Sequence, residues 1–116
     1  MANRSKAKGT SWETRIVNYL LSQLFRAKRK VLSGSEDRGD IEIEDFPWLV
    51  IEAKNEKTYR FPAYVEEAEK EAVNAGAEIG VAWVHRQRKA EAEDGFVIMS
   101  GATFVKLLKM FQSPVE

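Results

Sequence analysis

Residues 33–54, SGSEDRGDIEIEDFPWLVIEAK, contain two strand-like runs joined by a short turn. Residues 40–44 (DIEIE) alternate polar and apolar side chains, which is typical of a half-buried strand. Residues 48–54 (WLVIEAK) are rich in β-branched and aromatic residues and read as its partner. The intervening residues 45–47 (DFP) carry turn signals, because proline fixes φ and has no N–H for a ladder. The stretch therefore predicts a pair of adjacent strands.

Strand parity assigns the side chains of this pair to two faces, because alternate residues of a strand point to opposite sides of a sheet. A core on one side requires the two apolar sets to meet there. They meet when Ile41 lies opposite Ile51 and Ile43 lies opposite Leu49. This register is our prediction for the pair.

The same register sets Asp40 directly opposite Glu52, with Lys54 roughly 7 Å further along on the same side. Two carboxylates in this position repel each other, so we expect Asp40→Asn to stabilise the domain. A divalent cation between the carboxylates reverses the sign of their interaction, and their hard oxygens suit Mg²⁺. The pattern thus indicates a metal site beside an ammonium group.

Composition narrows the classes of protein and of metal site. The 116 residues are 44% hydrophobic and 31% charged, which predicts one globular domain. The absence of cysteine excludes disulfides, zinc–thiolate sites and thiol nucleophiles, and a single histidine excludes multi-histidine sites. A metal must then be held by carboxylates and carbonyls, which favours Mg²⁺, Mn²⁺ or Ca²⁺. No apolar run is long enough for a membrane span and no signal peptide is visible. We therefore expect a cytoplasmic protein, of a prokaryote or a phage-infected host.

The formal net charge is zero, but the charge is unevenly distributed. Residues 1–34 carry eight Lys or Arg and one acidic residue, whereas residues 35–116 carry ten and seventeen. A basic N-terminal third can meet phosphates even in a neutral chain. We expect residues 1–10 to form a flexible basic arm, either a disordered tail or a contact to a nucleic-acid backbone. A single domain is expected to follow at residues 11–112.

Hydrophobic periodicity and end signals place the remaining elements. Thr10 or Ser11 is expected to cap the first helix, Pro62 to open the second, Gly76 to close it and Ser100 to cap the third. The glutamates of the second helix read as a solvated face. The predicted order is α-β-β-β-α-β-β-α, a mixed α/β sheet flanked by helices: helix 12–26, edge strand 27–32, strands 40–44 and 48–54, helix 62–76, strands 78–85 and 95–99, and helix 101–112.

This order, with these residues, resembles the PD-(D/E)xK nuclease superfamily, and within it the archaeal-type and phage Holliday junction resolvases. The resemblance covers roughly residues 4–110 and implies a restriction-endonuclease-like fold. One departure is Gly39, which stands before Asp40 where the superfamily name has proline. The matching pieces are KGTSWETRIVNYL at 8–20, the loop Ser33-Gly34-Ser35, Asp40 at the start of a strand, and Glu52-Ala53-Lys54 ending the next strand.

The resemblance implies a Mg²⁺-dependent endodeoxyribonuclease, with Mn²⁺ as a possible substitute, that acts on branched DNA as a homodimer. Glu13, Asp40 and Glu52 would bind metal together with the Ala53 carbonyl. Lys54 would orient or deprotonate the attacking water. The accessory residue would be Ser35, or else Ser33. The basic residues expected at DNA are Arg4, Lys6, Lys8, Lys28, Arg29, Lys30 and Arg38.

Other interpretations of the same residues stay open. Glu13 also suits a helix start, where a carboxylate complements the helix dipole. Basic residues on an edge strand also protect that edge from aggregation. The fold alone is compatible with a restriction-type or repair endonuclease, or with a non-catalytic DNA-binding module. Loss of an acid or of the lysine is expected in such a module, and all four are present here.

Overall fold

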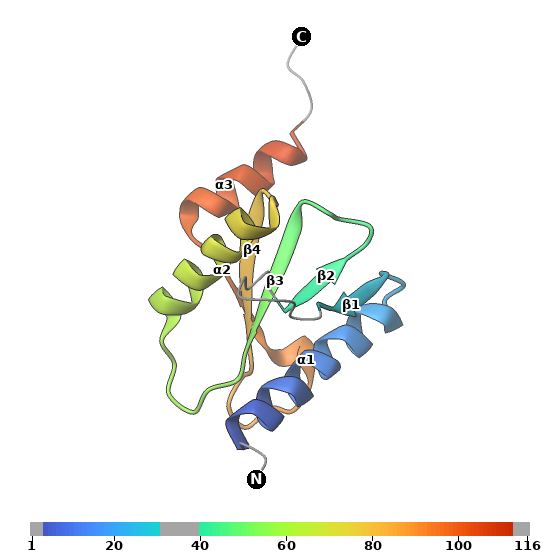
Figure 1. Ribbon diagram of the computed structural model, residues 1–116, viewed down its shortest axis with the longest axis vertical. Coiled ribbons are helices and arrows are strands. Elements are labelled where there is room, and N and C mark those ends of the chain that lie inside the picture. Colours follow the sequence, from blue (N-terminus) through green and yellow to red (C-terminus); the bar gives the residue numbers. More distant parts are fainter. Residues whose placement is uncertain (1–3, 31–39, 113–116) are drawn as a thin grey trace.

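The computed structural model describes the backbone of residues 4–30 and 40–112, and the side chains of residues 11–30 and 40–112. A mixed five-stranded sheet in the order β1-β2-β3-β4-β5 lies between helices (Figure 1). Among the described residues, no helix has the length and apolar character needed to span a bilayer. The elements are α1 (Arg4–Ser22), β1 (Ala27–Arg29), β2 (Ile41–Ile43), β3 (Leu49–Lys54), α2 (Phe61–Ala75), β4 (Ile79–Val84), the 3₁₀ helix η1 (Ala92–Asp94), β5 (Phe96–Ile98) and α3 (Gly101–Met110).

The predicted fold class and order of helices and strands are confirmed, and β1 lies at a sheet edge as expected. The β2–β3 pair is antiparallel with Ile41 opposite Ile51, as strand parity predicts. The β3–β4 pair is parallel, and α2 connects the two strands. This crossover requires α2 to pack back on the sheet, which brings its side chains near β3.

One core fills the space between α1 and the sheet. It includes Trp12 and Ile16 of α1 and Ile41 and Ile51 of the hairpin, all buried. The Trp12 indole N–H donates to the Trp83 carbonyl at 3.0 Å, which ties α1 to β4. The apolar face expected from parity is therefore the α1 face.

The first helix begins and ends earlier than expected. Its backbone is helical from Arg4, so the cap expected at Thr10 or Ser11 is wrong. The flexible basic arm expected at residues 1–10 stays a prediction. The apolar stripe begins only at Trp12, and periodicity cannot detect a helical turn that precedes the core. The helix ends at Ser22 because Leu24 adopts a left-handed conformation with φ 72°. The N–H groups of Leu24 and Phe25 donate to carbonyl groups of the last helical turn, as in a Schellman motif.

The opposite face of the sheet is covered by α2, which approaches β4 closely (Figure 1). Small side chains at Ala68 and Ala72 face Gly80 of β4, where a Cβ atom would lie 2.0 Å from the Ala68 carbonyl oxygen. Gly76 ends the helix in the left-handed region with φ 67°, as its position predicts. Close approach at Gly80 therefore fixes how deeply α2 sits on the sheet.

We predict that Gly80→Ala lowers the free energy of unfolding by about 1–3 kcal/mol, toward the upper end because the added methyl meets backbone. Gly101→Ala is the matched control, because a Cβ there meets nothing within 4 Å. It should leave stability unchanged or raise it by up to about 1 kcal/mol. Urea unfolding monitored by tryptophan fluorescence measures both. A Gly80→Ala variant as stable as the wild type would contradict the described seating of α2.

Candidate active site at the ends of β2 and β3

Asp40 is held between β1 and β3 by three hydrogen bonds. Its carbonyl accepts from the Lys30 N–H at 2.8 Å, and its own N–H donates to the Ile51 carbonyl at 3.1 Å. Its carboxylate oxygen Oδ2 accepts from the Ala53 N–H at 2.8 Å. The predicted register set Asp40 opposite Glu52 in the ladder. This part of the prediction is wrong, because β2 begins only at Ile41 and Asp40 lies before it. Its carboxylate instead lies against the peptide that follows Glu52.

Glu52 and Lys54 lie on the α2 face of β3, as parity predicts. Glu52 is only 6% exposed, and its Oε1 atom lies 3.4 Å from Lys54 Nζ. Lys54 Nζ also forms an ion pair with Glu67 of α2 and lies 5.7 Å from the centre of the Tyr64 ring. A buried carboxylate, an ammonium group and a second carboxylate thus form one charged cluster.

Glu67 was missed by the interpretation of the α2 glutamates as a solvated face. That interpretation is wrong for Glu67, which pairs with Lys54, and for Glu71, which is buried. The reason is the close seating of α2, which turns these side chains toward the sheet. A sequence signal existed, because Glu67 lies one helical turn after the apolar Tyr64 and therefore on the same side.

Lys54 retains its charge in this cluster. Burial opposes the charged form, but hydrogen bonding and attraction from Glu67 and Glu52 outweigh it and raise the pKa of Lys54 above its ordinary value. The ammonium is thus held as a cation next to Glu52.

Glu13 occupies a different environment from the other two acids. It lies on α1, and its Oε2 atom is 2.7 Å from Arg29 Nε. Within the part of the chain that the structure describes, no three Asp, Glu or His side chains are grouped closely enough to hold a metal ion. Asp40 and Glu52 nevertheless offer hard oxygen ligands beside one peptide, and Mg²⁺ often uses only one or two protein carboxylates. The donor set therefore fits Mg²⁺, with Asp40 and Glu52 as the residues that would hold it.

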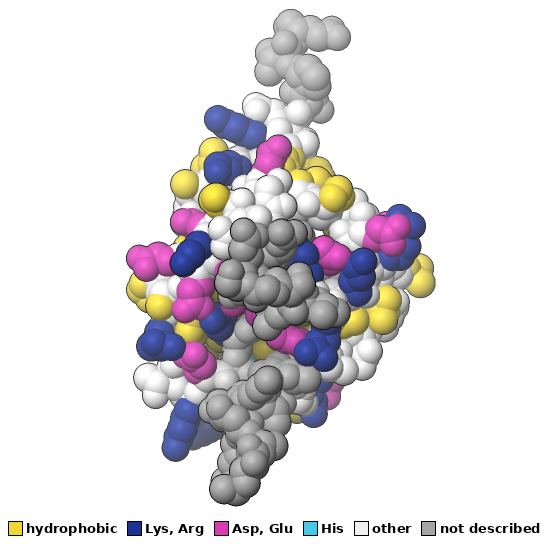
Figure 2. Space-filling model, in the orientation of Figure 1, with side chains coloured by type: hydrophobic (Ala, Val, Ile, Leu, Met, Phe, Trp, Pro, Cys, Tyr) yellow, Lys and Arg dark blue, Asp and Glu magenta, His cyan; other side chains and the backbone are white. Residues whose placement is uncertain are grey.

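The basic residues of β1, and Lys30 directly after it, form ion pairs. Lys28 and Lys30 lie 3.2 and 3.7 Å from Glu42, while Arg29 pairs with Glu13. Figure 2 shows basic and acidic side chains interspersed on this face of the molecule. Lys28 and Arg29 keep much of their side chains exposed, and ion pairs at a surface contribute little, so a phosphate can compete for these two cations. The other expected residues lie outside the described side chains: Arg4, Lys6, Lys8, Ser33, Ser35 and Arg38.

The single histidine is built into the structure near this site. The backbone N–H of His85 donates to the Lys54 carbonyl at 2.8 Å. The imidazole ring packs edge-on against Trp12, with centroids 4.8 Å apart. A hollow of about 200 Å³ opens beside it, lined also by Arg15 and Asn55. The end of β3, the middle of α1 and the residue after β4 therefore converge here.

A mixed sheet of this order, with α1 on one face and the β3–β4 crossover helix on the other, defines a restriction-endonuclease-like α/β fold. A solved structure that shares it is Hjc of Archaeoglobus fulgidus, a Holliday junction resolvase from an archaeal hyperthermophile. The match has a TM-score of 0.52 at 22% identity and covers 84% of this chain and 93% of that one. No family model and no curated protein matches the chain. The predicted likeness to a resolvase is thus confirmed for the fold.

We predict that Asp40→Ala lowers the free energy of unfolding by about 1–3 kcal/mol, because the Ala53 N–H loses its acceptor. Asp40→Asn keeps an oxygen in that position and should change stability by less than about 1 kcal/mol. Carboxylate repulsion alone predicts that Asp40→Asn stabilises the domain. The bond from the Ala53 N–H to Asp40 offsets that repulsion, so we expect little change instead. Urea unfolding in EDTA measures both variants. Equal stability of the alanine variant and the wild type would show that the bond to Ala53 contributes nothing.

A second prediction concerns the pH dependence of stability. The folded-state pKa of Lys54 is raised above an unfolded value of about 10.4, so its ion pairs stabilise the fold below that pH. This contribution is lost as the pH rises through the folded-state pKa. The stability difference between wild type and Glu67→Gln should therefore be largest near about pH 8 and shrink toward about pH 11.

Urea unfolding in EDTA across this range measures the difference. The exposed neighbour Glu66 provides the control, because Glu66→Gln leaves Lys54 and its partners in place. Its difference from the wild type should stay small and flat. A difference for Glu67→Gln that is equally flat would contradict the role of Glu67 as a partner of Lys54.

Proposed function

We propose that this chain is a metal-dependent DNA endonuclease that resolves four-way (Holliday) junctions. The observation that carries the proposal is the convergence of Asp40, Glu52 and Lys54 around one peptide of β3. The likeness in fold to Hjc supports a junction as the substrate. A composition that leaves carboxylates and carbonyls as metal ligands supports Mg²⁺, with Mn²⁺ as a substitute.

The roles of the residues follow from their positions. Asp40 and Glu52 would hold Mg²⁺ together with the Ala53 carbonyl, and Glu13 is proposed as a further acid reached from α1. When bound, Mg²⁺ lowers the pKa of water and neutralises charge on the phosphate.

Lys54 adds a fixed positive charge next to Glu52, where it favours the more negative transition state of phosphodiester hydrolysis. Glu67 positions that ammonium from α2 through its ion pair. Ser35 is proposed as an accessory residue of the same site.

Cutting two opposed strands of a junction requires two such sites, so we propose that the chain acts as a homodimer. Phosphate contacts are assigned to the basic residues of the first third of the chain, including Lys28, Arg29 and Lys30. DNA binding would then exchange the carboxylates of Glu42 and Glu13 for phosphates at these cations.

The test uses a labelled four-way junction and a linear duplex of matched sequence, each incubated with Mg²⁺ or EDTA. We expect paired nicks near the branch point, only with Mg²⁺, and little cutting of the duplex. Asp40→Asn and Glu52→Gln should each reduce the rate by at least about a hundredfold, because each removes a charged ligand. Asp94→Asn is the matched control, since Asp94 lies on η1 and not on β2, β3 or α2, the elements around the cluster.

Each outcome bears on a different part of the proposal. Cleavage by Asp40→Asn at the wild-type rate would contradict the site. Equal cutting of junction and duplex would instead favour a restriction-type or repair endonuclease. Binding without any cutting in Mg²⁺ or Mn²⁺ would indicate a non-catalytic DNA-binding module.

A further inference from the structure

A row of aromatic rings begins at the proposed active site. Lys54 Nζ lies over the Tyr64 ring, 5.7 Å from its centre. The Tyr64 ring meets Phe61 edge-on with centroids 6.2 Å apart, and Phe61 stacks on Tyr59 at 5.0 Å. Tyr64 is fully buried, whereas Phe61 is 37% exposed at the start of α2. The row therefore passes from the interior to the surface within three rings.

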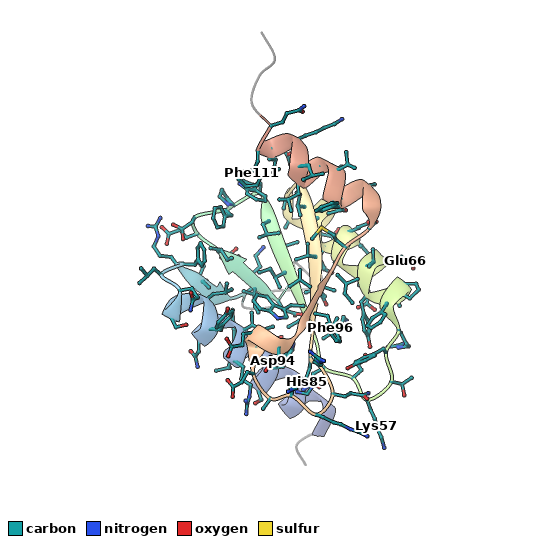
Figure 3. All side chains as sticks on the ribbon, turned by 180° about the vertical axis from the view of Figure 1, so that it is seen from behind. Lys57, Glu66, His85, Asp94, Phe96 and Phe111 are labelled. Carbon is teal, nitrogen blue, oxygen red and sulfur yellow. The ribbon has the colours of Figure 1, made fainter. Side chains whose placement is uncertain are left out.

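The row continues across the sheet to β5. The Tyr59 ring meets Phe96 edge-on, with centroids 6.4 Å apart. The guanidinium of Arg86 lies 5.5 Å above the Phe96 ring, and Phe96 is itself 37% exposed. In Figure 3, Phe96 lies on β5, with His85 and Lys57 toward the same end of the molecule. The row thus has a lysine at its buried end and an arginine at its exposed end.

Tyr59 holds this surface in a fixed arrangement. Its hydroxyl donates to the His85 carbonyl at 3.2 Å and accepts from the Gln87 N–H at 2.8 Å. The Gln87 side-chain amide in turn donates to the Lys57 carbonyl. These bonds join loop 55–60 to loop 85–90, so the rings are ordered before any ligand arrives, which reduces the entropic cost of binding.

The two loops are rich in basic side chains. Residues 55–60 and 85–91 contain five Lys or Arg and two carboxylates, Glu56 and Glu91. Glu56 forms an ion pair with Arg60 at 3.0 Å and accepts a hydrogen bond from the Tyr64 hydroxyl at 2.7 Å. Among the residues that the structure describes, the remaining four basic side chains enter no ion pair: Lys57, Arg86, Arg88 and Lys89.

The turn that presents these cations is unusual. Arg88 adopts a left-handed backbone conformation with φ 68°, which is uncommon for a residue with a side chain. The Lys89 N–H donates to the Arg86 carbonyl at 3.1 Å and closes the turn, and Arg15 of α1 donates to the Ala90 carbonyl at 3.0 Å. Arg15 of α1 thus holds the cationic turn from outside the loop, as the Tyr59 hydroxyl does through the Gln87 N–H.

Packing alone accounts for only part of this arrangement. Tyr64 and Tyr59 close the small core between α2 and the sheet. A purely structural row would cover its end rings, but Phe61 and Phe96 keep more than a third of their surface exposed, and the Arg86 guanidinium lies over Phe96. Aromatic faces interleaved with basic groups are what single-stranded nucleic acid binds: bases stack on the rings and phosphates meet the cations.

We propose that Phe61, Tyr59 and Phe96 form a stacking platform for unpaired bases of a DNA strand, whose phosphates are bound by Arg86, Arg88 and Lys89. This inference rests on the proposed function in one respect, because it takes DNA as the ligand. The buried Tyr64 ring contacts both Phe61 and Lys54, so a strand stacked on Phe61 would lie near the proposed cleavage site. The platform recognises a strand that is free to unstack, as at a branch point or a frayed end.

The test measures binding of fluorescein-labelled oligothymidylate by anisotropy in EDTA, over a series of salt concentrations. Phe61→Leu and Phe96→Leu should each weaken binding about five- to tenfold. The slope of log Kd against log salt should stay unchanged, because no charge is lost. Arg86→Gln should weaken binding and also reduce that slope, by about 0.7 for one phosphate contact on a single strand.

Phe111→Leu is the matched control, since Phe111 is a highly exposed phenylalanine just after α3, far from the platform (Figure 3). It should bind like the wild type. Thermal unfolding of each variant shows whether the fold is retained, and 2-aminopurine within the oligonucleotide reports stacking directly. Binding by Phe61→Leu and Phe96→Leu at wild-type affinity would overturn the platform, as would an equal loss in Phe111→Leu.

This result is separable from the junction assay. Mg²⁺-dependent cutting that depends on Asp40, together with normal strand binding by Phe96→Leu, would overturn the platform and leave the nuclease. Phe96-dependent strand binding without any cutting would support the platform and overturn the nuclease.

Discussion

The close contact between α2 and β4 at Gly80 determines where the chemistry of this molecule lies. Without a side chain at Gly80, the Ala68 backbone rests directly on the strand, and the helix sits deeply on the sheet. From this depth Glu67 reaches Lys54, and Tyr64 is buried against the same ammonium. A helix held further away would leave Glu52 and Lys54 facing solvent. The charged cluster thus depends on an interaction that contains no charge.

The hydrophobic pattern and strand parity were sufficient to predict how β2 pairs with β3. The surroundings of Asp40 and Glu67 depend on long-range packing, which the pattern does not contain. Alternation in residues 40–44 fixed which side chains of β2 and β3 enter the core, and the pairing of Ile41 with Ile51 followed. The bond from the Ala53 N–H to the Asp40 carboxylate was out of reach, because it forms where the regular ladder has already ended. The role of Glu67 depended on the depth of α2, which a helical pattern does not encode. The start of α1 was missed because its first turns precede the apolar stripe.

The chain has no net charge, but its surface cations differ in whether a carboxylate is paired with them. Lys28 and Arg29 of β1 are already paired with Glu42 and Glu13. In the described part of the chain, Arg86, Arg88 and Lys89 enter no ion pair. A phosphate meeting β1 must displace a carboxylate, but one meeting Arg86 or Lys89 need not. Different parts of the surface therefore differ in how readily they accept an anion, although the chain as a whole is neutral. The N-terminal charge excess seen in the sequence identifies only one of these regions.

The indole bond from Trp12 to the Trp83 carbonyl joins residues 71 positions apart in the chain. During synthesis, α1 leaves the ribosome long before the strand to which it is fixed. Until β4 has emerged, the apolar side of the first helix has no sheet to cover, and it stays available to chaperones or to other nascent chains. The domain can close only late, when nearly three quarters of its length has been made. The first helix is thus translated before the strands that complete its core.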